Sequence, residues 1–297
     1  MQTITPDYYD KFKCIANRCR HSCCIGWEID IDDDTIQKYN NLSGDFASFL
    51  KSNIEFCETP HFKLSANERC PFLNQNGLCD IITNLGEDML CQICADHPRF
   101  RNFYEGFTEI GLGLTCEAAA EIILTKKDKT TFNLPSKALE LPIIKFRENL
   151  FAVLQDRDFS VDERVDNLLT LIGAKLPDSV DWYLVFNGLE KLDSAWDTYL
   201  SRIKDGIQSP ITDNTLDTAY EQLLVYLIFR HFLDCRYDDM PTERILFAVL
   251  IYKVIRTMNT SNTMQELLEI ARLYSGEIEY SDQNINTLLL KLSAHQD

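Results

Sequence analysis

The sequence lacks the features of a membrane-spanning or exported protein. No stretch of its 297 residues approaches the roughly 18 uninterrupted apolar residues that a membrane span needs. The first segment, MQTITPDYYDKFKC, is polar and carries acidic residues, so we expect no signal peptide. A cytoplasmic location without a membrane partner is therefore the expectation.

Several chemical signatures are also missing. Neither a G-x-G-x-x-G nor a G-x-x-x-x-G-K-[ST] phosphate loop is present. The radical-enzyme signature C-x3-C-x2-C is absent, although Cys19-x3-Cys23-Cys24 comes close to it. The pair Gly111 and Gly113 fits a hairpin better than a cofactor loop. We find no repeat of fixed period, no low-complexity tract and no coiled-coil heptad run.

Basic residues are scarce. The chain has 29 lysines and arginines against 46 aspartates and glutamates, which gives a net charge of −17. The excess is spread along the chain, with −9 in residues 1–125 and −8 in the remainder. An evenly acidic protein repels the phosphate backbone, so we expect no nucleic-acid partner and favour basic or neutral proteins. A role of the acidity in solubility alone remains open.

Cysteine is abundant but unevenly placed. Ten of the eleven cysteines fall within the first 116 residues, and only Cys235 lies beyond them. In a reducing compartment, clustered thiols indicate metal ligation rather than disulfides. The odd total also counts against disulfides. We therefore predict a cysteine-rich metal-binding module over residues 14–116.

Composition divides the chain near residue 125. We predict a mainly α protein, with a cysteine-rich metal-binding domain over residues 1–125 and an all-helical domain over residues 126–297. In the first part, a helix is expected over residues 34–54, a small hairpin over residues 100–114 around Glu105-Gly106, and a helix from Thr115. The polar stretch KKDKTTFNLPSK, residues 126–137, has the composition of a linker. The expected later helices cover residues 139–154, 161–176, 180–203, 215–235, 242–258 and 264–274.

The cysteines of the first part form three groups. They are Cys14-x4-Cys19-x3-Cys23-Cys24, then Cys70, Cys79 and Cys94, and finally Cys116. Soft thiolates bind zinc or iron–sulfur clusters, and either takes about four cysteines, so eight candidates allow one site with spares or two sites. Only Cys91-x2-Cys94 resembles a zinc knuckle, and no second knuckle answers it. Ligands scattered over this length favour a cluster gathered from several loops, with zinc as the alternative.

These motifs have a recognisable pattern. The segments TPDYYDKFKCIANRCRHSCCIGWEIDID, CPFLNQNGLCDI and EIGLGLTCEAA, together with Cys94, Pro98 and Arg99, closely resemble the flagellin lysine-N-methylase family. That family is similar to a broader group of small proteins whose cysteines chelate zinc or iron. The resemblance covers about residues 5–124 and includes CCxGW and CPFL. The part after residue 125 offers no motif that we can match.

The resemblance implies a function and a ligand set. It implies methyl transfer from S-adenosylmethionine to lysine side chains of flagellin or another lysine-bearing protein, in a protein that carries a [4Fe–4S] cluster. The cysteines in matched order, which become the candidate metal ligands, are Cys14, Cys19, Cys23, Cys24, Cys70, Cys79, Cys94 and Cys116. Cys57, Cys91 and Cys235 lie outside the pattern, and we interpret them as ordinary small hydrophobic residues.

Methylation of a lysine requires a neutral amine, because an ammonium group has no lone pair to attack the methyl carbon. Glu109 and Tyr104 on the expected hairpin could reach such an amine, and Arg99 beside Asp96 and His97 could bind a carboxylate. Structural hydrogen bonds and ion pairs are the commoner roles of such residues. His21 and His61 could replace a cysteine ligand, although surface positions are commoner. The sequence singles out no catalytic residue and no donor-binding residue.

Two other functions remain open. One is a non-enzymatic zinc- or iron-binding module whose helical part engages a partner protein. The other is a redox protein whose cluster carries electrons. Binding of S-adenosylmethionine would separate the methyltransferase from both. The sequence gives no indication of the oligomeric state.

Overall fold

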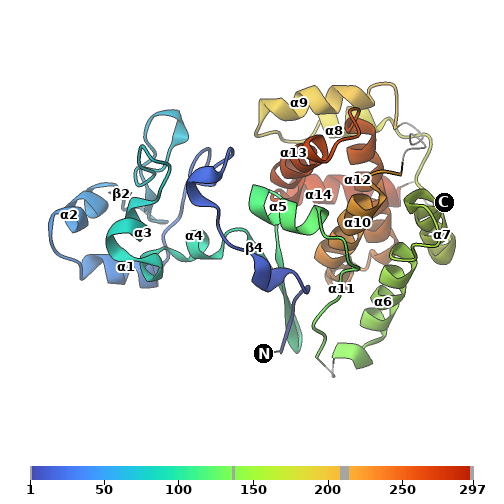
Figure 1. The fold of residues 1–297 in the computed structure, drawn as a ribbon, viewed down its shortest axis with the longest axis horizontal. Helices are drawn as coiled ribbons and strands as arrows, with labels where there is room; N and C mark the ends of the chain where they lie inside the picture. The colour runs from blue at the N-terminus through green and yellow to red at the C-terminus, as the bar shows by residue number, and fades with distance from the viewer. Residues whose placement is uncertain (1, 136–137, 208–213, 295–297) are drawn as a thin grey trace. The chain divides into compact units, whose positions relative to one another are not determined.

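Two helices in the carboxyl-terminal half of the chain are buried around almost their whole circumference. The computed structural model describes residues 2–135, 138–207 and 214–294. In it, α10 (Asp217–His231) and α12 (Pro241–Met258) pack against each other, and shorter helices surround them (Figure 1). A helix that is apolar on every side can be stable only inside a core. These two helices are therefore the centre of the larger part of the molecule.

The chain forms two compact units. The cysteine-rich unit is Lys13–Phe100, and the helical unit combines Met1–Phe12 with Arg101–Asp297. The protein is mainly helical, with small sheets and with many cysteines toward its amino terminus. The domain boundary that composition predicts near residue 125 stays a prediction. The structural units divide after residues 12 and 100 instead.

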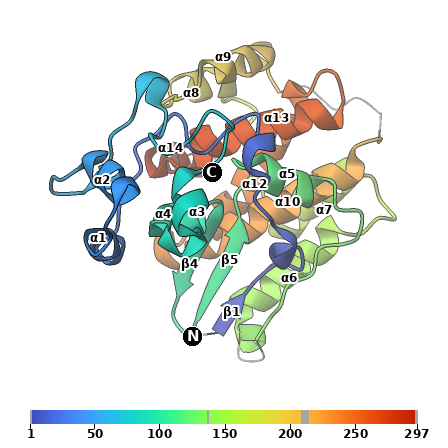
Figure 2. The same cartoon turned by 60° about the vertical axis from the view of Figure 1, so that its left-hand side comes forward.

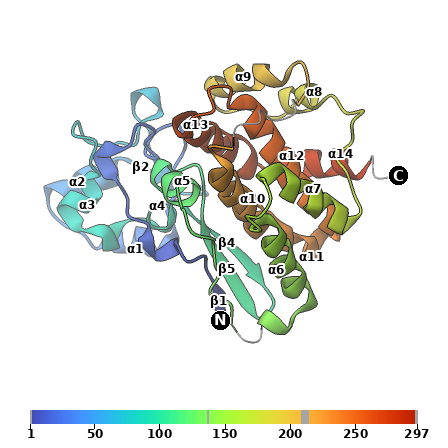
Figure 3. The same ribbon diagram turned by 45° about the vertical axis from the view of Figure 1, so that its right-hand side comes forward.

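The helical unit confirms most of the expected helices. Its further helices are α5 (Glu117–Leu124), α6 (Pro142–Leu154), α7 (Val161–Ile172), α8 (Trp182–Asn187), α9 (Ser194–Leu200), α11 (Cys235–Asp238), α13 (Met264–Tyr274) and α14 (Asp282–Ser293). Figure 3 shows α6 and α7 beside α10, against which both pack. In the described ranges, no helix has the length and apolarity to cross a membrane.

In the helical unit, one expected helix is divided and one helix was not expected. The single helix over residues 180–203 is divided into α8 and α9. The divide arises because the Glu277 carboxylate accepts hydrogen bonds from the backbone N–H groups of Leu192 and Asp193, and Asp193 then caps α9. Helix α14, whose first turn Ser281 caps, was not expected from the sequence.

A small sheet lies in the amino-terminal part of the helical unit. The hairpin is confirmed as β4 (Arg99–Tyr104) and β5 (Phe107–Leu112), and Gly106 in its turn has a φ of 90°. A third strand, β1 (Gln2–Ile4), was not expected. It pairs in parallel with β5 and places Ile4 opposite Glu109 (Figure 2).

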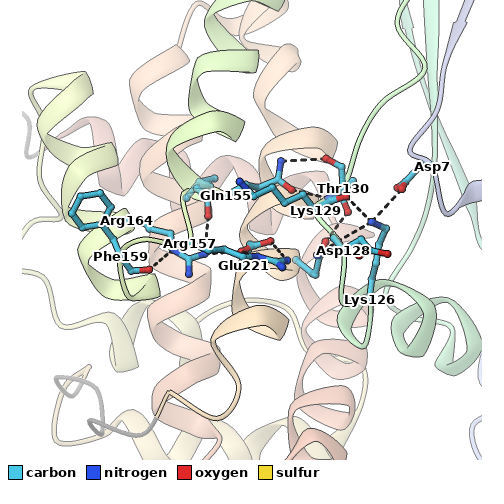
Figure 4. Close-up of polar contacts among 12 residues, drawn as sticks. Asp7, Lys126, Asp128, Lys129, Thr130, Gln155, Arg157, Phe159, Arg164 and Glu221 are labelled. Carbon is cyan, nitrogen blue, oxygen red and sulfur yellow. Dashed lines mark hydrogen bonds and ion pairs between the residues drawn. The ribbon is translucent and has the colours of Figure 1, made fainter.

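The stretch that resembles a linker is packed against the helical core. Lys126 forms an ion pair with Asp7 at 3.2 Å, and the Thr130 hydroxyl donates to Gln222 at 2.6 Å (Figure 4). The ring of Phe132 stacks at 4.6 Å on that of Phe151. Residues 126–135 therefore form an irregular connection after α5 that is packed against the core, and composition alone does not reveal these partners. Residues 136 and 137 lie outside the described residues.

Charges are buried inside the helical unit. Glu221 of α10 is fully buried and accepts hydrogen bonds from Arg157 at 2.8 and 2.9 Å and from Arg164 at 2.6 Å (Figure 4). Two guanidinium groups therefore satisfy both carboxylate oxygens. Such pairing is the condition under which a buried charge is tolerated.

The cysteine-rich unit consists of short elements. They are α1 (Asp33–Asn40), α2 (Asp45–Ser52), β2 (Ile54–Glu55), β3 (His61–Phe62), α3 (Asp80–Leu85) and α4 (Gln92–Asp96). The helix expected over residues 34–54 is divided in two, because Gly44 adopts a φ of 101° and begins α2. The core of the cysteine-rich unit combines aliphatic side chains with aromatic ones. The rings of Phe62 and Phe72, for example, meet edge to face with their centroids 4.9 Å apart.

Candidate metal centre

Sulfur atoms form part of the core of the cysteine-rich unit. Cys70 and Cys91 are buried members of its hydrophobic cluster. Cys24, Cys79 and Cys94 are half-buried and pack against the same cluster. These five residues, which we call the thiol cluster, come from segments that are up to 70 residues apart in the sequence. The fold therefore gathers thiols that the sequence scatters.

Backbone pairing brings the first two cysteine segments together. The Cys70 backbone N–H donates to the Cys24 carbonyl at 2.9 Å, and Ile25 forms an isolated bridge with Arg69. The Arg69 guanidinium then donates to the carbonyls of Leu73 at 3.1 Å and Asn74 at 2.8 Å. Arg69 therefore holds the CPFL loop through two of its carbonyls, and the backbone pairing joins that loop to the segment that carries Cys24.

The loop between Cys70 and Cys79 is shaped by a side chain that acts as a turn. The side-chain oxygen Oδ1 of Asn74 accepts hydrogen bonds from the backbone N–H groups of Asn76 and Leu78 at 2.9 and 3.0 Å. Gly77 has a φ of 72°, and a β-carbon there would lie 3.1 Å from the Asn17 side chain. The sequence N-Q-N-G thus returns the chain to Cys79 at the start of α3.

A carboxylate fixes the third segment. Asp32 caps α1 through the Thr35 backbone N–H at 2.9 Å and also accepts from the Gln92 backbone N–H at 2.7 Å. Burial opposes the charge of Asp32, but these hydrogen bonds outweigh it and lower the pKa of its carboxyl. Asp32 therefore ties α1 to α4, which carries Cys94 and begins after Cys91.

Two cysteine pairs are joined by hydrogen bonds between their thiols. A hydrogen bond with Cys23 lowers the pKa of Cys24 to about 7. In the second pair, a hydrogen bond with Cys94 lowers the pKa of Cys91, and the same hydrogen bond together with burial raises the pKa of Cys94. In each pair, one sulfur is stabilised as a thiolate by the S–H group of its neighbour.

The remaining thiols of the cluster are held neutral. Burial raises the pKa of Cys70 to about 12 and also raises the pKa of Cys79. Negative charge on the neighbouring sulfurs, including Cys24 and Cys91, raises the pKa of Cys70 further. Five thiolates at this density repel one another, so a cationic group is needed for all of them to ionise together.

The sulfur arrangement differs from a preformed site for a single ion. In the described parts of the chain, no three His, Cys, Asp or Glu side chains converge as they would around one metal ion. Four thiolates on one zinc lie about 3.8 Å apart, as Zn–S bonds of about 2.3 Å in a tetrahedron require. Thiolates that bind different irons of a cluster can lie further apart.

The eight candidate ligands have different surroundings. Cys24, Cys70, Cys79 and Cys94 belong to the thiol cluster, and Cys23 joins it through its hydrogen bond with Cys24. The other three do not belong to it. They are Cys14, which is exposed, Cys19, which is half-buried, and Cys116, which begins α5 in the helical unit. The full ligand set stays a prediction.

Cys91 was not predicted as a member of the thiol cluster, and Cys57 was predicted to be buried but is exposed. Cys91 is buried as expected of a small hydrophobic residue, but its thiol also pairs with Cys94. The spacing Cys91-x2-Cys94 was the signal in the sequence that could have indicated this pairing. Cys235 is buried, which agrees with the expectation. Cys57 is exposed, so the hydrophobic interpretation is wrong for it, because the turn between β2 and β3 carries it to the surface.

The backbone just before Cys116 contacts a buried polar network. The Leu114 backbone N–H donates to the Tyr226 hydroxyl at 3.4 Å, and that hydroxyl donates to Glu279 at 2.7 Å. Arg230 donates to the same hydroxyl at 2.8 Å and lies 3.1 Å from the Glu279 carboxylate. Glu279 ends a π-helical turn, Ser275–Glu279, a rare element that is frequent at functional sites. Charged residues within the apolar pattern of α10 were the signal for this network.

The candidate catalytic residues on the hairpin have structural partners. Glu109 is fully buried and accepts a hydrogen bond from the equally buried Arg147 at 2.6 Å. Burial raises the pKa of Glu109. The Tyr104 hydroxyl donates to Asp234 at 3.0 Å, and burial raises the pKa of Tyr104. These contacts favour the structural role for both residues.

The residues after Cys94 are also engaged locally. Asp96 accepts from the Gln92 side chain at 2.5 Å, and Arg99 donates to the Ala95 carbonyl at 3.4 Å. Burial lowers the pKa of His97 to about 4, so this ring is neutral near neutral pH.

Comparison with known proteins assigns the chain to a family. It is 31% identical over 136 residues to proteins named lysine-N-methylase from Salmonella typhimurium and Salmonella choleraesuis. It is 30% identical over 136 residues to the flagellar biosynthetic protein FliU of Salmonella muenchen, of which the match covers 79%. The chain belongs to the lysine-N-methylase and FliU family. This finding confirms the resemblance that the cysteine motifs indicate.

The family match has limited extent. It covers 42% of this chain, and the chain spans about a third (33%) of the length of the two lysine-N-methylases. No family model matches the chain. No solved structure matches it either. Membership in the lysine-N-methylase and FliU family therefore rests on one segment of 136 residues.

Proposed function

We propose that this protein is an iron–sulfur-containing protein lysine N-methyltransferase that transfers methyl groups from S-adenosylmethionine to lysine ε-amines of flagellin. The observation that carries the proposal is the thiol cluster in a chain whose relatives are named lysine-N-methylase and FliU. The thiols support the presence of an iron–sulfur cluster, and the names of the relatives support the reaction and its substrate.

The donor set consists of soft thiolates, which suit an iron–sulfur cluster and also zinc. The scatter of the cysteines over several loops favours the cluster. A [4Fe–4S] cluster would take Cys24, Cys70, Cys79 and Cys94 at separate irons. If only three of these four thiolates bound iron, the fourth iron would supply a Lewis-acidic position for the amino and carboxylate groups of the methyl donor.

The chain itself would contribute rigidity and charge. Arg69, Asn74 and Asp32 hold the sulfur-bearing loops in place through backbone hydrogen bonds, and such positioning is the main requirement for transfer between an amine and a sulfonium methyl group. The net charge of −17 favours the approach of a lysine-bearing protein. A substrate lysine must lose its proton before attack, and we assign no residue to that step.

The proposal is tested by methyl transfer with protein purified without oxygen. Incubation with flagellin and S-adenosylmethionine labelled in its methyl group is expected to place label on flagellin lysines, located by peptide mass spectrometry. Flagellin with acetylated lysines is the matched control and is expected to stay unlabelled. Binding of the donor is measured separately by equilibrium dialysis. A metal-loaded protein that neither binds the donor nor labels flagellin would contradict the proposal and favour the non-enzymatic alternative.

A further inference from the structure

A cysteine, a histidine and two glutamates lie together on the surface of the cysteine-rich unit, outside the thiol cluster. The Cys57 sulfur lies 3.6 Å from Nδ1 of His61. On the other side of the ring, Nε2 of His61 lies 3.3 Å from the Glu28 carboxylate and 3.8 Å from that of Glu55. Cys57 is exposed, whereas the His61 side chain is only 16% exposed. We propose that Cys57 is a reactive thiol, activated by His61, and that hydrogen peroxide modifies it.

The backbone holds the imidazole ring in this position. His61 is paired with Glu55 in the β2–β3 ladder and forms an isolated bridge with Asp30. The neighbouring Phe62 donates its backbone N–H to Ile29 at 3.1 Å. The histidine is therefore fixed between two chain segments, each of which supplies one of the glutamates. Two exposed carboxylates contribute little stability, but they give the Nε2–H group of the ring its acceptors.

The arrangement has the geometry of an activated nucleophile. Nε2 faces the two carboxylates, and Nδ1 lies 3.0 Å from the Thr59 carbonyl oxygen, so both ring nitrogens face hydrogen-bond acceptors. The Cys57 thiol donates to the same carbonyl at 3.0 Å. An imidazolium ring in this position places a positive charge 3.6 Å from the Cys57 sulfur, where it stabilises the thiolate that forms when the thiol proton is lost.

The reaction with hydrogen peroxide balances without another reactant. The Cys57 sulfur attacks one peroxide oxygen, an S–O bond forms, and the O–O bond breaks. The leaving hydroxide takes the proton held on His61 and departs as water. Sulfur is oxidised to a sulfenic acid while the peroxide is reduced. Exposure of the sulfur allows the peroxide to reach it, as it does at other cysteines that undergo this chemistry.

The test follows Cys57 by mass spectrometry in the whole protein. Trypsin releases residues 52–63, SNIEFCETPHFK, in which Cys57 is the single cysteine. Residues 231–236, HFLDCR, report the buried Cys235 as an internal reference. Iodoacetamide measures the nucleophilicity of Cys57, and peroxide with dimedone captures its sulfenic acid. Both reactions are expected to be at least about tenfold faster in the protein than in the synthetic peptide 52–63.

Variants separate activation from exposure. His61→Gln is expected to reduce the Cys57 rate to that of the synthetic peptide. Ser48→Ala, at an exposed position of α2, keeps every group around Cys57, so it is expected to react like the wild type. A wild-type rate equal to that of the peptide, or an unchanged rate in His61→Gln, would overturn the activation. Fast alkylation without a dimedone adduct on Cys57 would overturn the assignment of peroxide.

Discussion

Replacing Cys94 by alanine is expected to reduce the iron and acid-labile sulfide of the anaerobically purified protein to below about a tenth of the wild-type content. Loss of partners that only support a ligand costs 10- to 100-fold in metal affinity by rough estimate, so loss of a ligand itself should cost at least as much. Cys94 has a hydrogen-bonded thiol partner in Cys91, and negative charge on that partner or on Cys24 raises the pKa of Cys94. The measurement is iron by elemental analysis with sulfide determined on the same sample.

Cys235→Ala is the matched control for this experiment. Cys235 is also a buried cysteine, but it lies in the helical unit, and its pKa is raised to about 11 by burial, with no other cysteine contributing. Alanine and cysteine have similar sizes, so neither substitution should unfold the protein. Full iron and sulfide in Cys94→Ala, or equal losses in both variants, would contradict a metal centre in the thiol cluster.

Replacing Glu279 by glutamine is expected to lower the free energy of unfolding by about 3–5 kcal/mol, the usual cost of breaking a buried ion pair. Glu279 is buried and accepts hydrogen bonds from Tyr226 at 2.7 Å and Ser275 at 2.6 Å. Its carboxylate also lies 3.1 Å from Arg230, which would be left as a buried charge without a counter-charge. Chemical denaturation monitored by circular dichroism measures the loss.

The same pair predicts a pH dependence. Burial alone would raise the pKa of Glu279, but the Arg230 charge and the hydrogen bond with His231 outweigh it and hold the pKa at about 2. Because a glutamate in the unfolded chain titrates near pH ~4.3, this stabilisation is present above that pH and is lost as the pH falls toward 2. The Glu279→Gln variant should lack this part of the acid sensitivity.

An exposed glutamate provides the control for both measurements. Glu190 has an exposed side chain, so Glu190→Gln should change the stability by less than about 0.5 kcal/mol and keep the acid sensitivity. A loss below about 1 kcal/mol in Glu279→Gln would mean that the buried network contributes little to the fold.

Local signals in the sequence were sufficient for the hairpin and for most helices. Glu105-Gly106 between two runs of aromatic and β-branched residues predicts β4 and β5, because a turn and a period of two are local properties. They did not reveal β1, whose three residues acquire their structure only by pairing with β5. They also could not divide residues 180–203, because the dividing carboxylate, Glu277, is more than 70 residues away.

The candidate site was predicted at the level of residue type rather than geometry. Spacing and motif indicated thiolate ligands, and four of the predicted cysteines do lie in the thiol cluster. The membership of Cys91 depends on how Asp32 positions α4 through Gln92, a contact across 60 residues. The Cys57–His61 arrangement was missed for a similar reason, because the side chain of Glu28 approaches His61 only in the folded unit.

Metal and sulfide analysis of the wild-type protein, purified without oxygen and accompanied by its visible spectrum, decides whether the protein holds an iron–sulfur cluster. The thiol cluster is proposed to hold a [4Fe–4S] group, so we expect about four irons and four sulfides per chain with a broad brown absorbance. About one or two zinc ions per chain without sulfide would contradict the cluster and favour a structural metal in a binding protein.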